Sequence, residues 1–322
     1  MRDRYGPPAV VTIREVETPV PKSYEVLVRV RAASVNRADL DNLYPRWQFL
    51  RLFLGIRRPR VKLVGSDVAG VVESVGPKAT RFRPGDEVMG DLFSLGQGAF
   101  AEYVCASETA FASMPAGLSF EEAATLPHSA ILALQGLRLR NGRSAGVGDR
   151  VLIVGASGNV GPFAVQIAKS RGADVTGVAR GDKLDFVRFL GADHAIDYTK
   201  IDYTRPAERY DWIVDVDAHH SVLRWPGALR PRGAYVALGG DALWFLKALI
   251  QGPAVSLATR KRMGLMLWWK PLHPKDVEEL KELISAGMLK PAIDRRFPLS
   301  ETVAALRHVD DGHARGKVVI TP

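Results

Sequence analysis

The chain has 322 residues, of which 47% are hydrophobic and 25% are charged, a composition typical of globular proteins and not of disordered ones. Its single cysteine, Cys105, excludes an intramolecular disulfide and a multi-cysteine metal cage. The net charge of +9 leaves nucleic acid, an acidic membrane surface or an anionic small ligand as partners.

Two of these partners are not favoured by the sequence. The basic residues are mostly scattered, and the densest cluster, Arg57 to Arg60, lacks an interleaved aromatic series, so nucleic-acid binding is a minority hypothesis. The longest uncharged run, from Val151 to Ala168, contains glycines and a proline. It therefore predicts strand, turn and helix in place of a membrane span. With no signal-like start in "MRDRYGPP", we expect a cytoplasmic protein that does not insert into membranes.

The first hundred residues predict short antiparallel strands in a barrel-like arrangement. "YEVLVRVRAASV" alternates from Tyr24, "DVAGVVESVG" follows from Asp67, and "PGDEV" marks a turn at Pro84. Ser119 and Glu122 then have capping-box spacing. They predict the start of one helix that runs through "AILALQGLRLR".

After a glycine-rich loop, strands and helices alternate, which predicts a parallel, doubly wound sheet. The predicted elements are strands at 151–154 and 174–179, helices at 160–170 and 183–190, and strands in "HAIDY", "WIVDV" and "AYVAL". Beyond about Thr259 the pattern changes. A helix is expected from Pro274 to Gly287, and "AIDRRFPLS" and "GKVVITP" are expected to rejoin the first region as strands. For "RKRMGLMLWW" we favour a subunit interface or helix packing over a membrane surface.

The stretch "VLIVGASGNVG" places Gly155, Gly158 and Gly161 between a strand and a helix. Backbone N–H groups and the helix dipole meet at such a turn, which is suited to a pyrophosphate. The spacing is G-x-x-G-x-x-G, and a tight turn in an ordinary core is the alternative. Because the whole strand–turn–helix–strand unit is about thirty residues long, phosphate binding is favoured.

The end of the second strand distinguishes the two nicotinamide dinucleotides. An acidic residue there would bind the ribose 2′-hydroxyl of NAD, but this chain has Arg180 and Lys183 in "VARGDK". An arginine fork matches a 2′-phosphate. Asp182 is the competing feature, and we interpret it as a helix cap. The residues therefore predict NADPH over NADH.

Eight segments in order resemble one known group: "AASVNRADL", "LVGSDVAGVVESVG", "RPGDEVMG", "GAFAEYV", "EEAATLPHSAILALQGL", "GDRVLIVGASGNVG", "GADHAIDY" and "GHARGKVVI". The chain is similar to the medium-chain dehydrogenase/reductases, and most of all to their zinc-independent quinone-oxidoreductase branch. The resemblance implies an α/β protein in which a GroES-like barrel-type catalytic domain (1–122 and 260–322) flanks a Rossmann domain (123–259). It also implies a cofactor cleft at their junction, and we expect a homodimer.

The departures from the zinc-dependent members bear on the chemistry. Asn36 in "SVN" and "GSD" at Gly65 to Asp67 stand where those enzymes have metal ligands, and the structural four-cysteine loop is absent. We therefore predict no metal. Alcohol oxidation benefits from a Lewis acid, so we favour reduction of quinones or α,β-unsaturated carbonyls by hydride transfer from NADPH. Zinc-free reduction of simple aldehydes or ketones is the alternative.

The catalytic candidates are Tyr44, Asn36, Asp67 and His128. Tyr44 follows the "SVN" segment and offers a phenol to a carbonyl; its alternative is a packed aromatic. Asn36 could hold cofactor or substrate oxygen, and Asp67 could orient its neighbours. His128 titrates near neutrality, but a histidine beside apolar residues is more often part of the core, so we rank it below Tyr44.

For the cofactor, the resemblance implies a set of positions along the chain. They are Gly155, Ser157, Gly158, Asn159, Val160 and Gly161 at the pyrophosphate, Arg180 and Lys183 at the 2′-phosphate, Tyr198 near the adenosine, and Leu238, Gly239, Gly240, Asn36 and Lys317 elsewhere along the dinucleotide.

A function from another class stays open. "DVDAHHSVL", with His219 and His220, stands where relatives carry a valine–glycine segment, close to the expected nicotinamide end. An obstructed site there would leave an NADPH-binding protein with little turnover, serving as a sensor or as a nucleic-acid-binding protein.

Overall fold

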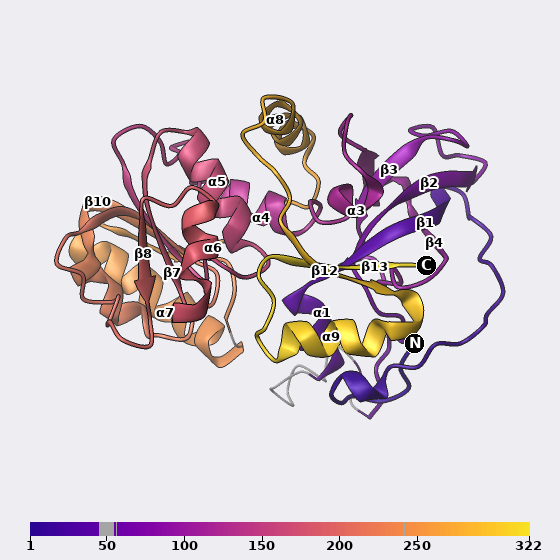
Figure 1. Ribbon diagram of the computed structural model, residues 1–322, viewed down its shortest axis with the longest axis horizontal. Helices are drawn as coiled ribbons and strands as arrows, with labels where there is room; N and C mark the ends of the chain where they lie inside the picture. The colour runs from indigo at the N-terminus through magenta and orange to yellow at the C-terminus, as the bar shows by residue number, and fades with distance from the viewer. Residues whose placement is uncertain (45–54, 56, 241) are drawn as a thin grey trace. The chain divides into compact units, whose positions relative to one another are not determined.

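The computed structural model describes residues 1–44, 55, 57–240 and 242–322. The chain divides into two compact units. Figure 1 colours the chain by residue number, so that the segments of each unit can be found in it. Unit 1 comprises Met1–Ile131, Pro271–Lys281 and Pro291–Pro322, and unit 2 comprises Leu132–Lys270 and Glu282–Lys290. The boundary after the first segment lies at residue 131, later than the expected 122, because His128 is hydrogen-bonded to Asp67 and Asp91 of unit 1. The second boundary lies at 270 and not at 259.

Unit 1 is built on a seven-stranded sheet in the order β12-β13-β1-β2-β3-β5, with β4 also paired to β1. Its strands are β1 (Glu25–Val35), β2 (Asp67–Val75), β3 (Glu87–Asp91), β4 (Tyr103–Ser107), β5 (Phe111–Ser113), β12 (Ile293–Pro298) and β13 (Lys317–Thr321). The C-terminal β13 pairs antiparallel with β1, Val318 opposite Val35. The expectation that both chain ends build one sheet is confirmed.

Unit 1 also contains helices and short 3-10 turns. They are η1 (Pro8–Val10), α1 (Arg37–Leu43), η3 (Glu108–Ala110), α3 (Phe120–Ala123), η6 (Leu299–Glu301) and α9 (Thr302–Asp310). Of these, α9 contacts β1, β12 and β13, and α3 contacts β1 and β2. Leu40 and Leu43 of α1 pack with Leu306 of α9 in an apolar cluster. This packing holds α1 in place directly after β1.

The single helix expected after Ser119 is wrong. The capping box at Ser119 and Glu122 is present, but α3 ends at Ala123. A second helix, α4 (Ser129–Gly136), follows after a break that contains Pro127. Proline lacks the N–H that would continue the helix and disfavours a helical residue before it. Pro127 of "LPHS" thus interrupts a helix, whereas Pro162 of "GPFA" is tolerated because it stands in the first turn of α5.

Unit 2 contains a six-stranded parallel sheet in the order β11-β10-β9-β6-β7-β8. The strands are β6 (Arg150–Val154), β7 (Asp174–Ala179), β8 (His194–Asp197), β9 (Tyr210–Asp215), β10 (Leu229–Ala237) and β11 (Arg262–Leu265). The helical segments are α5 (Gly161–Ser170), η4 (Gly181–Lys183), α6 (Leu184–Phe189), η5 (Val222–Ala228) and α7 (Ala242–Thr259), and α8 (Pro274–Ser285) begins in unit 1 and ends in unit 2. The predicted doubly wound sheet is confirmed.

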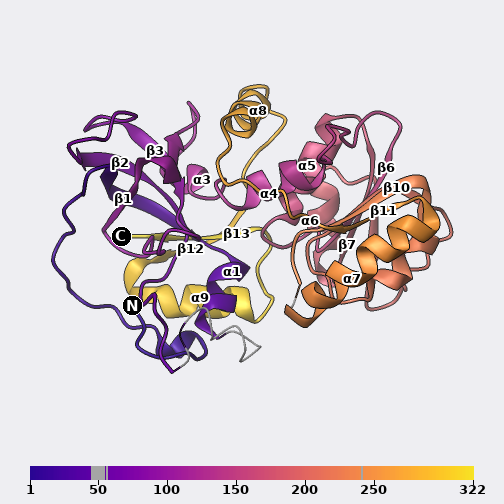
Figure 2. The same cartoon turned by 180° about the vertical axis from the view of Figure 1, so that it is seen from behind.

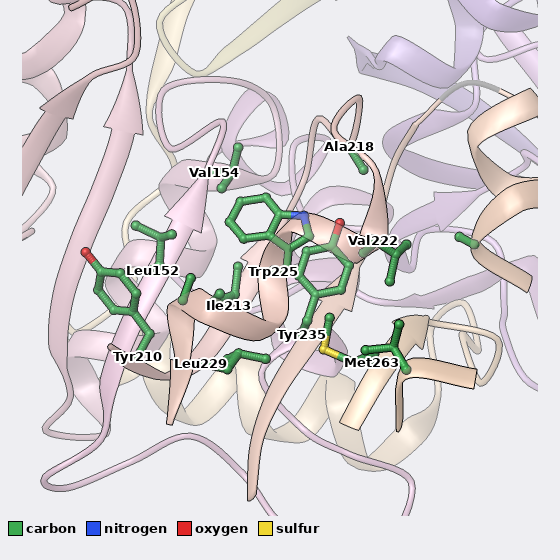
Figure 3. Packing of buried hydrophobic residues seen from close by; sticks show 14 of the residues in the cluster. Leu152, Val154, Tyr210, Ile213, Ala218, Val222, Trp225, Leu229, Tyr235 and Met263 are labelled. Carbon is green, nitrogen blue, oxygen red and sulfur yellow. The ribbon is translucent and has the colours of Figure 1, made fainter. Parts of the chain in front are cut away.

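The segment "RKRMGLMLWW" supplies the edge strand β11, an assignment that the sequence interpretation missed. Figure 2 shows α7 running along the near side of β10 and β11. Met263 and Leu265 are buried in the core of unit 2 together with Trp225 and Tyr235, whose rings stack with centroids 5.2 Å apart (Figure 3). Three of the segment's six apolar residues, Met263, Leu265 and Met266, are therefore buried, whereas Leu267 is exposed.

Candidate active and cofactor sites

A cluster of buried polar side chains lies where β1, β2 and β13 meet in unit 1. Asn36 directly follows β1 and is the N-cap of α1, Asp67 opens β2, and Lys317 opens β13. All three are buried, with Lys317 only 1% exposed. Because β1 pairs with both β2 and β13, residues 281 positions apart along the chain come into contact.

The ammonium of Lys317 is the centre of this cluster. Its Nζ donates to Asn36 Oδ1 at 2.6 Å and to Ser129 Oγ at 3.0 Å, and it lies 3.5 Å from Asp67 Oδ2. Asn36 Nδ2 donates to Ser66 Oγ at 3.2 Å. A buried lysine is stable only when charge and hydrogen bonds compensate its lost hydration, and these contacts provide that compensation.

The charges of the cluster shift one another's protonation. Burial raises the pKa of Asp67, and the charge of Lys317 opposes that rise. Burial lowers the pKa of Lys317, against the attraction of Asp67. Burial also raises the pKa of Asp39 to about 7, although the backbone N–H of Asn36 donates to its carboxylate. The ionisation of each of these groups therefore depends on the charge of its neighbours.

His128 forms a dyad with Asp91 beside this cluster. Its Nδ1 lies 3.0 Å from Asp91 Oδ2, and its backbone N–H donates to Asp67 Oδ1 at 3.1 Å. Burial lowers the pKa of His128, but the hydrogen bond and charge of Asp91 outweigh it, so the pKa lies above its usual value. A histidine held in this way keeps a proton near neutrality.

Tyr44 lies at the end of α1, apart from the Lys317 contacts. Its hydroxyl donates to Asp310 of α9, and its ring packs against the apolar cluster that contains Leu40. The phenol is thus engaged with a carboxylate within unit 1. The segment that follows, residues 45–54, is outside the described residues.

The glycine-rich turn of unit 2 joins β6 to α5 as predicted. Gly155 has a φ of +78°, which favours glycine. A Cβ on Gly161 would lie 2.2 Å from the carbonyl oxygen of Gly155, so α5 starts in direct contact with the turn. Ser157 and Val160 are buried, whereas Gly158 has ordinary space around it. This turn is a cradle of the kind that holds a pyrophosphate, and Asn159 lies within it.

Arg180 directly follows β7 and is half-exposed, but its guanidinium is not free. It binds the carboxylate of Asp182 through Nε at 2.6 Å and Nη2 at 2.9 Å. The hydrogen bonds from Arg180 lower the pKa of Asp182 to about 2. The interpretation of Asp182 as a helix cap is wrong, since α6 has Lys183 at its N-cap with no side-chain cap. Lys183 is buried, whereas Tyr198 is exposed.

The remaining cofactor candidates of unit 2 lie at the end of β10. Leu238 N donates to Asp215 O at 2.8 Å, and a Cβ on Gly239 would lie 2.4 Å from Val216 O. Gly240 forms a parallel bridge with Ala218. Since the carboxyl ends of parallel strands share one edge of the sheet, these residues and the glycine turn lie on the same edge, where open α/β sheets bind ligands.

The comparisons with known proteins agree with this geometry. Residues 22–116 match the family model of the alcohol dehydrogenase GroES-like domain, and residues 190–320 match that of zinc-binding dehydrogenases. The mouse (Mus musculus) mitochondrial NAD(P)H oxidoreductase RTN4IP1 is 33% identical over 92% of this chain and 81% of its own length. A chloroplastic quinone-oxidoreductase homologue from spinach (Spinacia oleracea) is 33% identical over 96% and 93%. The solved quinone oxidoreductase of Coxiella burnetii superposes with a TM-score of 0.85 at 29% identity, over 100% and 98%.

The chain is a medium-chain dehydrogenase/reductase. It belongs to the quinone-oxidoreductase branch and is an oxidoreductase that uses a nicotinamide cofactor. The expected family and fold class are confirmed. None of the helices among the described residues has the length and apolar character needed to cross a membrane.

The residues around Lys317 of this dehydrogenase/reductase do not fit a zinc ion. Within the part of the chain that the structure describes, no three His, Cys, Asp or Glu side chains converge as metal ligands. The ammonium of Lys317 lies within hydrogen-bond reach of Asn36 Oδ1 and near Asp67 Oδ2. Lys317 thus already neutralises the Asp67 carboxylate and occupies Asn36 Oδ1, and a tetrahedral site would lack its three protein ligands.

Sequence reasoning missed several members of both sites. Asp39, Ser66, Asp91 and Ser129 complete the hydrogen bonds of the Lys317 cluster. The spacing of Asn36 and Asp39, typical of a capping box, was the one local signal for any of them. Asp215, at the end of β9, was missed in unit 2.

Asp215 is buried at the end of β9, and it gives this dehydrogenase/reductase a pH-dependent term in its stability. Tyr235 donates to its Oδ2 at 2.8 Å, while Oδ1 is buried with no partner among the described residues. Burial raises its pKa to about 7. Because the folded-state pKa is the higher one, the stabilising contribution is complete below the ordinary pKa of 3.8 and is lost as pH rises through about 7.

We expect Asp215→Asn to remove this pH dependence. Near pH 8 its free energy of unfolding should exceed that of the wild type by about 2 kcal/mol, because part of the gain from removing the charge is offset by an unbonded amide. Near pH 4, where Asp215 is protonated, the charge-removal gain is absent and the variant should be less stable than the wild type by about 1–2 kcal/mol because of the unbonded amide. Urea unfolding across that range checks the expectation, and parallel curves at every pH would contradict it.

Proposed function

We propose that this chain reduces quinones or α,β-unsaturated carbonyl compounds with NADPH and without zinc. The quinone substrate is inferred from relatives that are named as quinone oxidoreductases. One observation on this chain carries the proposal: a buried lysine ammonium, not a metal-ligand set, neutralises Asp67 and binds Asn36. Without a Lewis acid for an alkoxide, an acceptor that delocalises charge itself is the better substrate.

The proposal divides the chemistry between cofactor and chain. NADPH, when bound, supplies the hydride. The acceptor also needs a proton, and the chain holds one on His128, whose charged form Asp91 stabilises. The glycine turn at Gly155 to Gly161 supports a pyrophosphate through backbone N–H groups. Asn36 and Ser129 are fixed by Lys317 and can orient polar groups without rearranging.

NADPH is favoured over NADH because of Arg180. The guanidinium lies at the carboxyl end of β7, and Tyr198 lies at the end of the neighbouring β8. Arg180 now binds Asp182, so a 2′-phosphate would replace that carboxylate on the same fork. Arginine pairs with phosphate through two parallel hydrogen bonds. The cytoplasmic location and the homodimer expected from the sequence stay predictions.

The test follows NADPH absorbance with a quinone, an alkenal, a cyclic enone and a simple aldehyde, each with and without a chelator. We expect oxidation by conjugated acceptors, insensitive to chelator and slower with NADH. Oxidation of the aldehyde alone would favour the carbonyl-reductase alternative. Tight NADPH binding with no oxidation by any acceptor would favour a binding protein.

We expect Arg180→Ala to weaken NADPH binding and to leave NADH binding nearly unchanged. Loss of a charge-assisted fork to a phosphate costs about 1.5–3 kcal/mol, or roughly tenfold to a hundredfold in Kd. Cofactor fluorescence titration measures both constants. Equal losses for the two cofactors would refute the assignment of Arg180 to the 2′-phosphate.

We expect His128→Asn to lower kcat roughly a hundredfold, as removal of a general acid does, with little change in NADPH affinity. Asp91→Asn should lower kcat less. Because Asp91 raises the pKa of His128, its removal should move the alkaline fall of activity to lower pH. Tyr44→Phe is the comparison variant, and a larger loss there than at His128 would transfer the donor role to Tyr44.

A further inference from the structure

Asp182 lies in the turn that follows β7, at the edge of the sheet of unit 2 where Arg180 is placed for a 2′-phosphate. The 3-10 turn η4 begins directly after Arg180, whose own backbone is still extended. A Cβ on Gly181 would lie 2.4 Å from Asp197 Oδ2, so the turn passes directly against the end of β8. The side chains of Arg180 and Asp182, two residues apart, meet at this turn.

The contact between these two side chains occupies donors of Arg180 that a phosphate would use. Nε donates to Asp182 Oδ1 at 2.6 Å and Nη2 donates to Asp182 Oδ2 at 2.9 Å, which makes the pair bidentate. Arginine binds a phosphate through the same arrangement of two hydrogen bonds. A phosphate at the other end of the guanidinium would lie beside the carboxylate, and like charges repel. The carboxylate and a 2′-phosphate are therefore alternative partners of one guanidinium.

The carboxylate of Asp182 is charged at every pH near neutrality. The hydrogen bonds from Arg180 lower the pKa of Asp182 to about 2, and the charge of Lys183 on the same turn also lowers it. The second carboxylate at this edge, that of Asp197, is buried and accepts hydrogen bonds from the backbone N–H and the hydroxyl of Thr199. Asp182 is thus the carboxylate that holds Arg180, and it does so independently of pH.

A purely structural role does not account for this pair. Its two side chains are 43% and 47% exposed, and exposed ion pairs contribute little to stability. A pair of this ordinary kind, between Asp185 and Arg188, lies a few residues further along the chain on α6. The pair of Arg180 and Asp182 differs from it in place, because it lies at the carboxyl end of a parallel strand, where open α/β sheets bind their ligands.

We propose that Asp182 sets the cofactor preference of this enzyme by competing with the 2′-phosphate of NADPH for the guanidinium of Arg180. The inference rests on the proposed function, in which Arg180 binds that phosphate. NADPH must open the pair, whereas NADH, which has a hydroxyl in place of the phosphate, leaves it closed. The apparent affinity for NADPH is lowered by the fraction of molecules in which the pair is open. The enzyme therefore discriminates between the two cofactors less than an arginine without this partner would.

Two nucleotides that differ only in the 2′-phosphate test the proposal without depending on turnover. They are adenosine 2′,5′-bisphosphate and adenosine 5′-monophosphate, and titration calorimetry measures their binding. We expect Asp182→Ala to bind the bisphosphate roughly fivefold more tightly, because an exposed ion pair no longer has to open, and to bind the monophosphate as the wild type does. Asp182→Glu, which keeps the carboxylate, should stay close to the wild type. Unchanged affinity of Asp182→Ala for the bisphosphate would overturn the proposal.

Two further variants separate competition for Arg180 from general charge. Asp185→Ala removes the same charge from the pair with Arg188 on α6 and should bind both nucleotides as the wild type does. An equal gain in Asp185→Ala would mean that net charge alone is responsible, and the proposal would be wrong. Arg180→Ala/Asp182→Ala should bind the bisphosphate no more than about twofold more tightly than Arg180→Ala does. A larger gain there would mean that Asp182 repels the phosphate directly, which also contradicts the proposal.

Arg180→Ala separates this inference from the assignment on which it rests. If that variant weakens binding of the bisphosphate alone, Arg180 binds the 2′-phosphate, and the Asp182 variants then decide the inference. If it weakens both nucleotides equally, the assignment itself fails, and the inference fails with it. In steady-state assays Asp182→Ala should lower the KM for NADPH and not that for NADH. A higher KM for NADH with no gain for NADPH would mean that Asp182 binds the ribose 2′-hydroxyl, and the competition proposed here would be wrong.

Discussion

Replacement of Lys317 by Met should be among the most destabilising single substitutions in unit 1. It removes the ammonium but keeps most of the side-chain volume, so Asp67 Oδ2 and Asn36 Oδ1 lose their buried donor. Breaking a buried ion pair from one side costs about 3–5 kcal/mol. The charge of Lys317 lowers the pKa of Asp67. Without it that pKa rises further, so the loss should grow as the pH rises and Asp67 becomes charged.

Guanidinium unfolding of three variants separates charge from packing. Lys317→Met/Asp67→Asn removes both charges and should recover at least half of the lost free energy of unfolding, since no uncompensated carboxylate is left. Lys281→Met is the control, because Lys281 pairs with Glu278 on the surface and such pairs contribute about 0–1 kcal/mol. A pH-independent loss that the double variant does not recover would mean that Lys317 contributes packing alone.

The fold was predictable from the sequence in segments of up to about thirty residues, where hydrophobic periodicity and glycine positions indicate the local structure. The β6–turn–α5–β7 unit was placed within one residue at each boundary. The predicted helix after Ser119 was too long because the apolar periodicity of the sequence continues past Pro127. The backbone N–H that proline lacks does not change this periodicity, so periodicity alone does not show where the helix ends. The strand β11 was missed because "RMGL" has only four residues, too few for its alternation to indicate a strand. Its pairing with β10, which lies more than twenty residues earlier, defines it.

The cluster around Lys317 was predictable only in part. Asn36 and Asp67 were candidates because of the family resemblance, His128 because histidine titrates near neutrality, and Lys317 was named for the cofactor. No local pattern indicates that Lys317 contacts Asn36, since antiparallel pairing of the two chain ends brings them together. Asp91 becomes relevant only because β3 pairs with β2 opposite Asp67. Contacts that depend on the sheet register between distant segments cannot be inferred from the spacing of residues along the sequence.

For the glycine-rich turn, in contrast, the effect of a substitution can be predicted from contacts between individual atoms. We expect Gly161→Ala to weaken NADPH binding roughly a hundredfold and to destabilise unit 2 by about 1–3 kcal/mol. The added Cβ would lie 2.2 Å from Gly155 O and 2.6 Å from two backbone atoms of Ala156. Backbone atoms cannot rotate away as a side chain does, so the turn must open, and its N–H groups then lose the geometry that a pyrophosphate requires.

Two other glycines provide the controls for that expectation. In Gly158→Ala the new Cβ would be 3.5 Å from Gly155 O, an ordinary contact, and in Gly227→Ala it would have nothing within 4 Å. Both variants should therefore unfold at wild-type denaturant concentrations, and Gly227→Ala should also bind NADPH normally. Weak binding in Gly158→Ala despite full stability would place the phosphate directly against that residue. Wild-type affinity in Gly161→Ala would show that the turn does not hold the dinucleotide, because the close contact between α5 and the turn is the feature on which that assignment depends.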